Sequence, residues 1–204
     1  VLSKLGIQNI DETIKDYLSA SAETVKKSFF SSKYSFPIML AFLLAFFNQL
    51  SGINFILYYA PEILERAGLA SKDSLFSSIS IGVVNLIFTM SGIYLIDRIG
   101  RKTLMLVGSI GYIISLSMVA YAFYAGLGSG FLLFFICLFI ASHAIGQGAV
   151  IWVFISEIFP NQVRATGQSF GSSVHWVFAA LITLITPVFL DAKDGIFKDN
   201  PWPI

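Results

Sequence analysis

Apolar stretches of about twenty residues recur along the chain, and short polar loops separate them. A helix rises about 1.5 Å per residue, so each stretch is long enough to cross the roughly 30 Å apolar core of a bilayer. The pattern predicts an all-α membrane protein, a bundle of transmembrane helices at about residues 37–59, 75–96, 103–124, 131–155 and 167–190. The last polar loop ends at residues 201–204 (Pro-Trp-Pro-Ile), which we interpret as the start of a sixth span.

The first apolar stretch contains polar residues that a lipid-facing helix does not need. Asn48 and Gln49 follow the apolar run 38–47, and Asn54 comes just after Ser51 and Gly52. Amide groups in the middle of a span are costly unless they face a cavity or a partner. We therefore interpret this stretch as part of a functional site whose walls are the other spans.

Residues 1–33 form the longest polar segment and are predicted to be a cytoplasmic linker region ahead of the bundle, which occupies residues 34–204. Ile10, Ile14 and Leu18, together with Tyr17, recur at helical spacing between charged residues. This pattern predicts a short amphipathic helix outside the membrane. A solvated linker and a lipid-binding helix are both compatible with it.

Composition agrees with a membrane protein. Apolar residues make up 56% of the chain and charged residues 12%, whereas soluble domains carry about 25% charge. The net charge of +1 gives no reason to expect a nucleic-acid partner. The single cysteine, Cys137, excludes an internal disulfide. Because the chain starts at Val1 and not at methionine, we expect a fragment of a longer protein.

The basic residues predict the orientation of the bundle, because loops rich in lysine and arginine face the cytoplasm. One side of the membrane would carry nine of them: Lys4, Lys15, Lys26, Lys27, Lys33, Arg98, Arg101, Lys102 and Arg164. The other side would carry four: Arg66, Lys72, Lys193 and Lys198. The amino-terminal segment is therefore predicted to be cytoplasmic.

Polar residues on three different spans fall near the middle of the membrane. Counting residues from the span ends places Gln49, Asn85 and His175 at a similar depth. A single buried amide often serves only to hold two helices together. Three polar residues at one depth, with Asn48 and Asn54 beside them, favour a cavity filled by water or substrate.

Glycines interrupt the first and fourth predicted spans. Ser51 and Gly52 break the first, and residues 146–148 (Gly-Gln-Gly) break the fourth. In transporters built from inverted repeats, paired interruptions of this kind mark the binding site. Gly148 precedes Trp152 by one turn, which leaves room for the indole. Trp152 and Trp176 are either part of the site or interface anchors, and the depth of Trp176 favours the site.

These residue types suit a neutral, polyhydroxylated ligand. Amide side chains both donate and accept hydrogen bonds, as hydroxyl groups do, and an indole plane packs against the apolar face of a sugar ring. No charged residue falls inside a predicted span, so nothing there would balance a permanently charged substrate.

Five charged residues fall in the loops predicted to be cytoplasmic: Asp97, Arg98, Arg101, Glu157 and Arg164. One interpretation is a set of exposed charges that only fix topology, worth about 0–1 kcal/mol per pair. The other is a charge network that holds the cytoplasmic side closed in one state and releases it in another.

These motifs resemble those of the sugar porters of the major facilitator superfamily. The matching segments are residues 49–54 (Gln-Leu-Ser-Gly-Ile-Asn) with Tyr58 and Tyr59, residues 97–102 (Asp-Arg-Ile-Gly-Arg-Lys), and residues 157–160 (Glu-Ile-Phe-Pro) with Arg164 and Gly167. They are similar to the family's seventh span, the loop between spans eight and nine, and the loop after span ten. The resemblance covers nearly the whole chain and implies the carboxy-terminal half of such a transporter.

The resemblance also implies roles for individual residues. Positions that contact the sugar in the family match Gln49, Asn54, Asn85, Trp152 and Trp176, and the tyrosine pair Tyr58 and Tyr59 helps to close the outer gate. Asn48 stands where many members have a second glutamine, and His175 stands where asparagine or glutamine is usual. The predicted sugar site therefore also includes Asn48 and His175, and the predicted gate also includes Gly148.

The implied function is transport of a neutral monosaccharide across the plasma membrane by alternating access, as proton-coupled symport or as facilitated diffusion. The expected partners are the sugar, a co-transported proton in a symporter, membrane lipid and the amino-terminal half of the transporter, with no cofactor and no metal. A non-transporting sugar sensor on the same fold is the alternative. An enzyme is not expected, because the two histidines, His143 and His175, lie on different spans and no nucleophile or metal motif is present.

Overall fold

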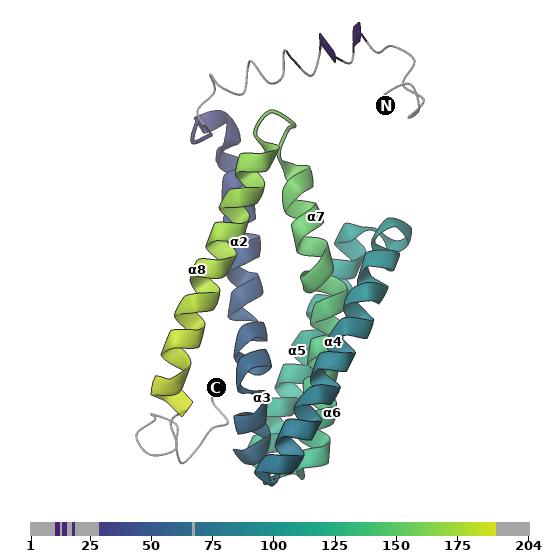
Figure 1. Ribbon diagram of the computed structural model, residues 1–204, viewed down its shortest axis with the longest axis vertical. Coiled ribbons are helices and arrows are strands. Elements are labelled where there is room, and N and C mark those ends of the chain that lie inside the picture. The colour runs from purple at the N-terminus through teal and green to yellow at the C-terminus, as the bar shows by residue number, and fades with distance from the viewer. Residues whose placement is uncertain (1–10, 13, 16–17, 19–28, 67, 191–204) are drawn as a thin grey trace.

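The computed structural model describes residues 11–12, 14–15, 18, 29–66 and 68–190. Helices make up all its main elements, and no strand occurs among these residues (Figure 1). Ile10 and Tyr17 of the predicted amphipathic helix lie outside the described residues, as do residues 201–204 of the predicted sixth span. The predictions for these two ends therefore remain predictions.

The described residues contain five helical segments that are long and apolar enough to cross a membrane, which confirms the predicted all-α bundle. These segments are Ser32–Arg66, Ser71–Ile99, Arg101–Ala125, Ser129–Ile158 and Arg164–Phe189. Their elements are the 3-10 turn η2 (Ser32–Tyr34), α2 (Ser35–Leu50), α3 (Ile53–Arg66), α4 (Ser71–Ile99), α5 (Arg101–Ala125), α6 (Ser129–His143), the π-helix η3 (Ala144–Gly148), α7 (Ala149–Ile158) and α8 (Arg164–Leu190).

Some helix ends differ from the predicted ones. The first span continues to Arg66, beyond its predicted end at residue 59. Pro61 therefore lies inside α3, and Tyr59 departs from helical geometry with φ −109° and ψ 16°. Proline lacks the N–H that continues the helix ladder and its ring crowds the preceding turn, so here the helix kinks without ending. Helix α8 begins at Arg164, three residues before the predicted start at Gly167.

Gly100 alone separates α4 from α5, so the predicted basic loop is a reversal at a single residue. Its φ of 89° lies in the region that glycine adopts without steric cost. The Gly100 N–H donates to the carbonyl oxygen of Ile96 and closes the end of α4. This tight reversal brings the charged ends of the two helices together.

Both predicted glycine interruptions are present. Helices α2 and α3 are separated at Ser51 and Gly52, and Gly52 has a φ of 81°. In the fourth span the π-helix η3 lies between α6 and α7. A π-helical turn has backbone hydrogen bonds between residues five apart in place of the four of an α-helix, and such turns are frequent at functional sites.

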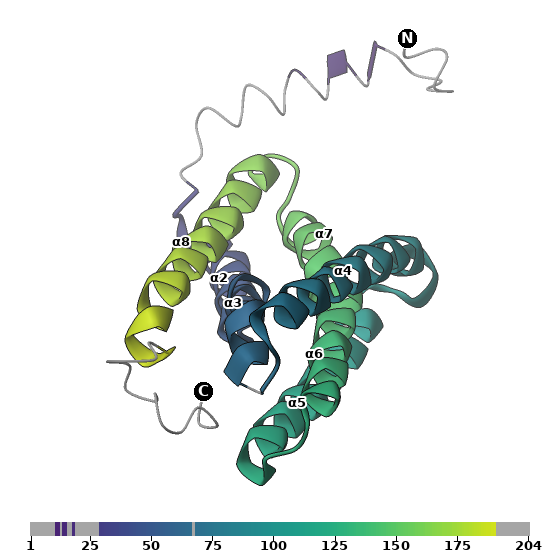
Figure 2. The same cartoon turned by 60° about the horizontal axis from the view of Figure 1, so that its bottom comes forward.

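The helices form two packed groups. Helix α2 packs mainly on α8, whereas α6 packs on α5 and α4. Figure 1 and Figure 2 both show α8 beside α2, with α4, α5 and α6 grouped together. The irregular segment η3 contacts α4, α5 and α7, so it lies at the junction of the helices.

Glycines allow the backbones around η3 to touch. A Cβ added at Gly108 of α5 would lie 2.7 Å from the Cα of Gly146 and from the carbonyl oxygen of Ser142. A Cβ at Gly92 of α4 would lie 3.2 Å from the carbonyl oxygen of Ala144. Small residues at helix contacts are the usual way for membrane helices to approach closely.

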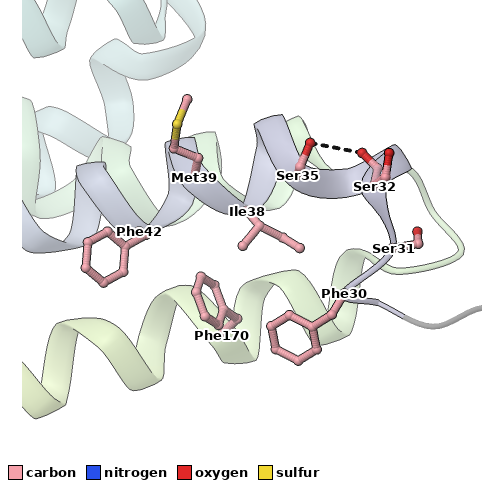
Figure 3. A pocket seen from close by; sticks show the side chains of 8 residues that line it. All are labelled: Phe30, Ser31, Ser32, Ser35, Ile38, Met39, Phe42 and Phe170. Carbon is pink, nitrogen blue, oxygen red and sulfur yellow. Dashed lines mark hydrogen bonds between the residues drawn. The ribbon is translucent and has the colours of Figure 1, made fainter.

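Aromatic side chains join the segment before η2 to the end of α7 and to α8. The ring centroid of Phe29 lies 5.7 Å from that of Phe159 and 5.9 Å from that of Phe170. Beside them is a pocket of about 400 Å³ (Figure 3), lined by Phe30, Ser31, Ser32, Ser35, Ile38, Met39, Phe42 and Phe170. The Ser35 hydroxyl donates to the carbonyl oxygen of Ser32, so it is occupied within its own turn. The pocket lacks the convergent polar groups of a sugar site.

The predicted orientation can be tested by cysteine labelling. Lys102 and Lys72 are exposed residues near opposite ends of the bundle. A cysteine at Lys102 is expected to react with a membrane-impermeant maleimide only from the cytoplasmic side, and a cysteine at Lys72 only from outside. Labelling in right-side-out and inverted vesicles measures both. The reverse pattern would contradict the predicted orientation.

Gly171 is expected to matter for folding, because it faces a neighbouring helix and not lipid. A Cβ at Gly171 would lie 3.0 Å from the Cγ2 of Ile155 on α7. Leucine there would overpack the contact at a cost of about 1–3 kcal/mol, so Gly171→Leu should lower the yield of monodisperse transporter several-fold. Ala180→Leu, at an exposed position of the same helix, is the control. Normal yield and uptake in Gly171→Leu would show that the contact is dispensable.

Candidate functional site

Gln49 and His175 meet between α2 and α8. The amide nitrogen of Gln49 lies 2.8 Å from Nε2 and 3.0 Å from Nδ1 of the His175 imidazole. On its other side, the Gln49 oxygen accepts a hydrogen bond of 2.8 Å from the Asn54 amide on α3. The three side chains thus form a polar chain that crosses the glycine break and ends on α8.

Two indole rings flank the imidazole. The Trp152 ring of α7 lies 4.8 Å from His175, centroid to centroid, at an interplanar angle of 61°. The Trp176 ring lies 5.4 Å away at 79° and is 60% exposed. The site therefore combines hydrogen-bonding groups with aromatic surface, and the aromatic part is the more accessible one.

The structure does not bring Asn48 and Asn85 into this chain. Asn48 lines a separate pocket of about 480 Å³ together with Ser109 and Gln147. Its side chain is 4% exposed, and its Oδ1 has no hydrogen-bond partner among the described residues. Asn85 lies half-buried on α4, and its side chain makes no hydrogen bond with the described part of the chain.

The predicted gating residues have different surroundings. The Tyr59 hydroxyl donates to the carbonyl oxygen of Thr183 at 3.1 Å, which links α3 to α8, whereas Tyr58 is exposed. A Cβ at Gly148 would meet His143, at 3.4 Å from its carbonyl oxygen and 3.7 Å from its Nδ1. The space at Gly148 is therefore bordered most closely by His143.

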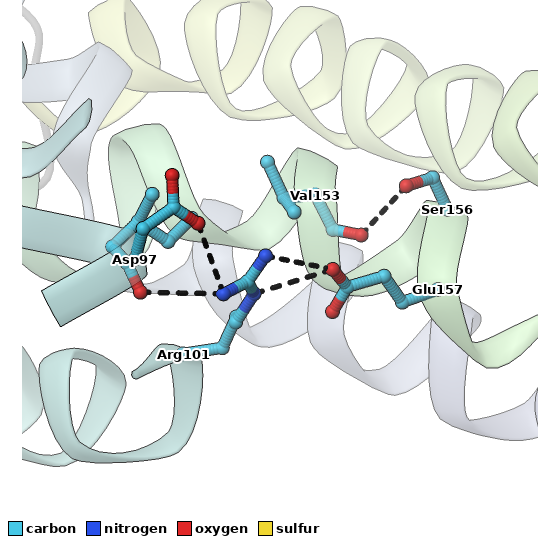
Figure 4. A network of polar contacts seen from close by, with 6 residues as sticks. Asp97, Arg101, Val153, Ser156 and Glu157 are labelled. Atoms are coloured by element: carbon cyan, nitrogen blue, oxygen red, sulfur yellow. Dashed lines mark hydrogen bonds and ion pairs between the residues drawn. The ribbon is translucent and has the colours of Figure 1, made fainter. Parts of the chain in front are cut away.

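Arg101 is the centre of the charge cluster (Figure 4). Its guanidinium lies 3.2 Å from a carboxylate oxygen of Asp97 and 3.0 Å from one of Glu157. Arg101 thereby joins the ends of α4, α5 and α7. Arg98 lies over the Tyr94 ring at 4.3 Å, and Arg164 donates to the carbonyl oxygen of Phe159. Within the described residues, neither of these two arginines makes an ion pair.

Two polar features were missed from the sequence. The Gln147 amide donates to the Ser109 hydroxyl at 2.9 Å, next to Asn48. Gln147 lies within the predicted glycine interruption, but a role was predicted only for the glycines beside it. His143, at the start of the π-helix, is 6% exposed and its Nε2 has no partner among the described residues. Its position in an apolar run gave no signal beyond its residue type.

The chemistry of the site is that of neutral hydrogen bonding. Amide and imidazole groups can pair with hydroxyls, and the indoles offer apolar surface. No cluster of three metal-ligating side chains occurs in the described part of the chain. The five apolar helical segments of spanning length define a multi-pass integral membrane protein.

Comparison with known proteins identifies the family. Residues 2–199 match the family model described as "Sugar (and other) transporter". The chain belongs to this family of sugar transporters, within the major facilitator superfamily. It is thus a member of a transporter family and not of an enzyme family.

Individual relatives agree with this assignment. The chain is 32% identical to the arabinose-proton symporter of Bacillus subtilis (strain 168), over 94% of this chain and 40% of that protein. It is 34% identical to the glucose facilitated diffusion protein of Zymomonas mobilis, over 76% and 33%. The inward-open structure of the xylose transporter from E. coli matches with a TM-score of 0.70 and 27% identity, over 98% and 41%.

The match therefore spans about one-third to two-fifths of the length of these relatives. The two relatives named from the sequence comparison are a symporter and a facilitated-diffusion protein. The alternative of a sugar sensor gains no support from them.

Proposed function

We propose that this chain forms the carboxy-terminal half of a transporter that carries a neutral monosaccharide across the plasma membrane by alternating access. The observation that carries the proposal is the polar chain of Asn54, Gln49 and His175 with the Trp152 indole beside it, inside an apolar bundle. Membership of the sugar transporter family supports the same function. The amino-terminal half would supply the rest of the cavity.

His175, Trp152 and Trp176 are proposed as the wall on which the sugar lies. An indole covers the C–H face of a sugar ring, and the imidazole hydrogen-bonds to a hydroxyl group. Gln49 and Asn54 belong to the same cluster. The contacts of Asn48 and Asn85 with the sugar remain predictions. Neither side chain belongs to the hydrogen-bonded chain of the site, so each would have to reach the sugar from outside it.

Tyr58, Tyr59 and Gly148 are proposed to take part in gating. The hydrogen bond from Tyr59 to Thr183 ties α3 to α8 close to the kink before Pro61. The glycine break and the π-helix provide two places where the inner and outer parts of a span can move separately. These elements support an opening and closing motion around a site near the middle of the membrane.

Two transport mechanisms are compatible with this chain: proton-coupled symport and facilitated diffusion. The names of the relatives include a proton symporter and a facilitated-diffusion protein. In the five described spans, carboxylates occur only toward the ends: Glu62, Glu65, Asp73, Asp97 and Glu157. A carboxylate that couples a proton to the sugar would then lie in the other half of the transporter.

Uptake into proteoliposomes tests the proposal. The complete transporter that contains this chain is reconstituted and supplied with radiolabelled D-xylose, L-arabinose or D-glucose, with L-glucose as the control for leakage. We expect saturable uptake of at least one of the first three sugars. Uptake that rises with an inward proton gradient and falls with an uncoupler would indicate symport. Leakage-level uptake of all three would contradict the proposal.

A further inference from the structure

We infer that Phe29, in the segment before the first span, is a positioning residue for the cytoplasmic charge cluster around Arg101. Its ring holds the end of α7 in the place where Glu157 reaches Arg101. The effect on this ion pair stands on the structure alone, whereas the effect on transport rests on the proposed function. The segment before the first span then takes part in opening and closing the cytoplasmic side, and is more than a connection.

Phe29 is buried although it precedes the first span. Its side chain is 9% exposed, whereas the next residue, Phe30, is 75% exposed. The Phe29 ring belongs to a buried apolar cluster with Ile155 and Phe159, and its centroid lies 5.7 Å from that of Phe159 and 5.9 Å from that of Phe170. An aromatic ring that is buried in this way gains stability from the surfaces that cover it. Here those surfaces belong to α7 and α8.

Phe159 is the residue at which α7 ends. Its backbone is extended, with φ −100° and ψ 137°, and its carbonyl oxygen accepts a hydrogen bond from Arg164 at the start of α8. Its ring lies directly on the bare backbone of Gly167, because a Cβ at that position would overlap the ring. The end of α7 is therefore held by α8 and by the Phe29 ring together.

Glu157 lies on the last turn of α7, next to this anchor. One of its carboxylate oxygens lies 3.2 Å from Nε and 3.0 Å from a terminal nitrogen of the Arg101 guanidinium (Figure 4). Hydrogen bonds weaken steeply when the groups shift or turn. Because Glu157 and Phe159 adjoin at the end of one helix, a movement of Phe159 also moves the Glu157 carboxylate.

Removing the Phe29 ring leaves space into which Phe159 can move. Protein interiors are closely packed, and neighbours relax part of the way into the space that a large-to-small substitution creates. The end of α7 then takes up more than one position, and the contact between Glu157 and Arg101 is formed for a smaller share of the time. The pair of Arg101 with Asp97 joins α5 to α4 without α7, so it should persist.

Nuclear magnetic resonance of the sugar-free transporter tests the effect on the ion pair. The complete transporter that contains this chain is labelled with ¹⁵N at the arginine Nε, and the Arg101 signal is assigned from Arg101→Lys. An ion pair of up to about 1 kcal/mol slows exchange of the Nε–H with water by up to about fivefold. We expect this exchange to become about two- to fivefold faster in Phe29→Ala, and no faster than in Glu157→Gln.

Phe30→Ala is the matched control, because Phe30 has the same side chain in the same segment but is exposed. Its Arg101 signal should exchange as in the wild type. An unchanged Arg101 signal in Phe29→Ala, or an equal change in Phe30→Ala, would overturn the inference.

Two further variants keep the test valid if Phe29→Ala does not fold. Phe29→Leu fills part of the space and should give a smaller change of the same kind. Gly167→Ala reaches the same ring from α8, since the added Cβ displaces Phe159 while Phe29 stays unchanged. It should also speed the exchange of the Arg101 Nε–H. An Arg101 signal that stays the same in both variants would overturn the inference as well.

Uptake of D-xylose by the reconstituted transporter tests the effect on transport. We expect Phe29→Ala to lower maximal uptake about two- to fivefold and to leave the dissociation constant within about twofold, because the ion pair and not the sugar is affected. In the Glu157→Gln background the same change should lower uptake less than about 1.5-fold, since the contact through which it acts is gone.

The outcomes separate the inference from the proposed function. An equal loss of uptake in both backgrounds would show that Phe29 does not act through Glu157, and would overturn its role in transport. Absence of uptake of D-xylose, L-arabinose and D-glucose by the wild type would refute the proposed function. The arginine resonances of the sugar-free protein would still decide whether Phe29 positions Glu157.

Discussion

Replacing Gly108 with leucine is expected to remove most of the folded transporter from the membrane. A Cβ at this position would lie 2.7 Å from backbone atoms of Gly146 and Ser142, and backbone cannot rotate out of the way as a side chain can. Overpacking costs about 1–3 kcal/mol even where side chains adjust, and a protein has only about 5–15 kcal/mol of stability. We expect the yield of monodisperse protein, measured by fluorescence size-exclusion chromatography, to fall below about a tenth of the wild type.

Gly82→Leu is the matched control. Gly82 lies in the interior of α4, a Cβ there would meet nothing within 4 Å, and its neighbours Val83 and Leu86 are exposed apolar residues. Leucine at this position should fold normally. Similar yields for the two variants would mean that α5 and the π-helix can separate without loss of the fold.

The sequence alone predicted the spans and their interruptions because both depend on local properties. Runs of apolar residues set the five spans, and Gly52, Gly146 and Gly148 mark the breaks. What each glycine packs against could not be predicted in the same way. The partner of Gly108 is Gly146, on another span, and the pairing depends on how two helices cross. Pro61 shows the same limit, because a proline in a sequence is compatible both with the end of a helix and with a kink inside one.

The depth of the site residues along their helices could be predicted from the sequence, but the direction in which each side chain points could not. Counting residues placed Gln49 and His175 at one level, and their side chains meet in the structure. Successive residues of a helix point about 100° apart, so Asn48 can face another pocket although it adjoins Gln49. The angle around the helix axis depends on packing among several spans. For Asn85 and Asn48, depth alone was therefore not enough to define a contact.

Replacing Arg101 with alanine is expected to slow transport and leave sugar binding nearly unchanged. Arg101 joins the ends of α4, α5 and α7 through Asp97 and Glu157, far along the chain from His175. The Asp97 and Glu157 side chains are largely or half exposed, so each ion pair contributes only about 0–1 kcal/mol. We expect maximal uptake to fall about three- to tenfold, and the dissociation constant to stay within about twofold.

The physical reason is that the cluster fixes how three helix ends move. If the cytoplasmic side alternates between a closed and an open state, a bond present in only one of them changes the exchange rate without touching the sugar. The ion pairs of Arg101 with Asp97 and Glu157 join three helix ends of this half, so they would keep these helices together as the half moves. Arg101→Lys keeps the charge but loses the planar guanidinium group. Its maximal uptake should lie between that of Arg101→Ala and that of the wild type.

Arg98→Ala is the control for this prediction, because Arg98 belongs to the same basic motif but packs over Tyr94 and makes no ion pair with the described residues. Its uptake should stay within about twofold of the wild type, since an exposed cation over an aromatic ring contributes only about 0.5–1 kcal/mol. Uptake and binding are both measured on purified, reconstituted transporter. A loss of binding in Arg101→Ala as large as its loss of uptake would show that the cluster supports the sugar site itself. Equal effects of Arg98→Ala and Arg101→Ala would show that the positive charge matters and the ion pairs do not.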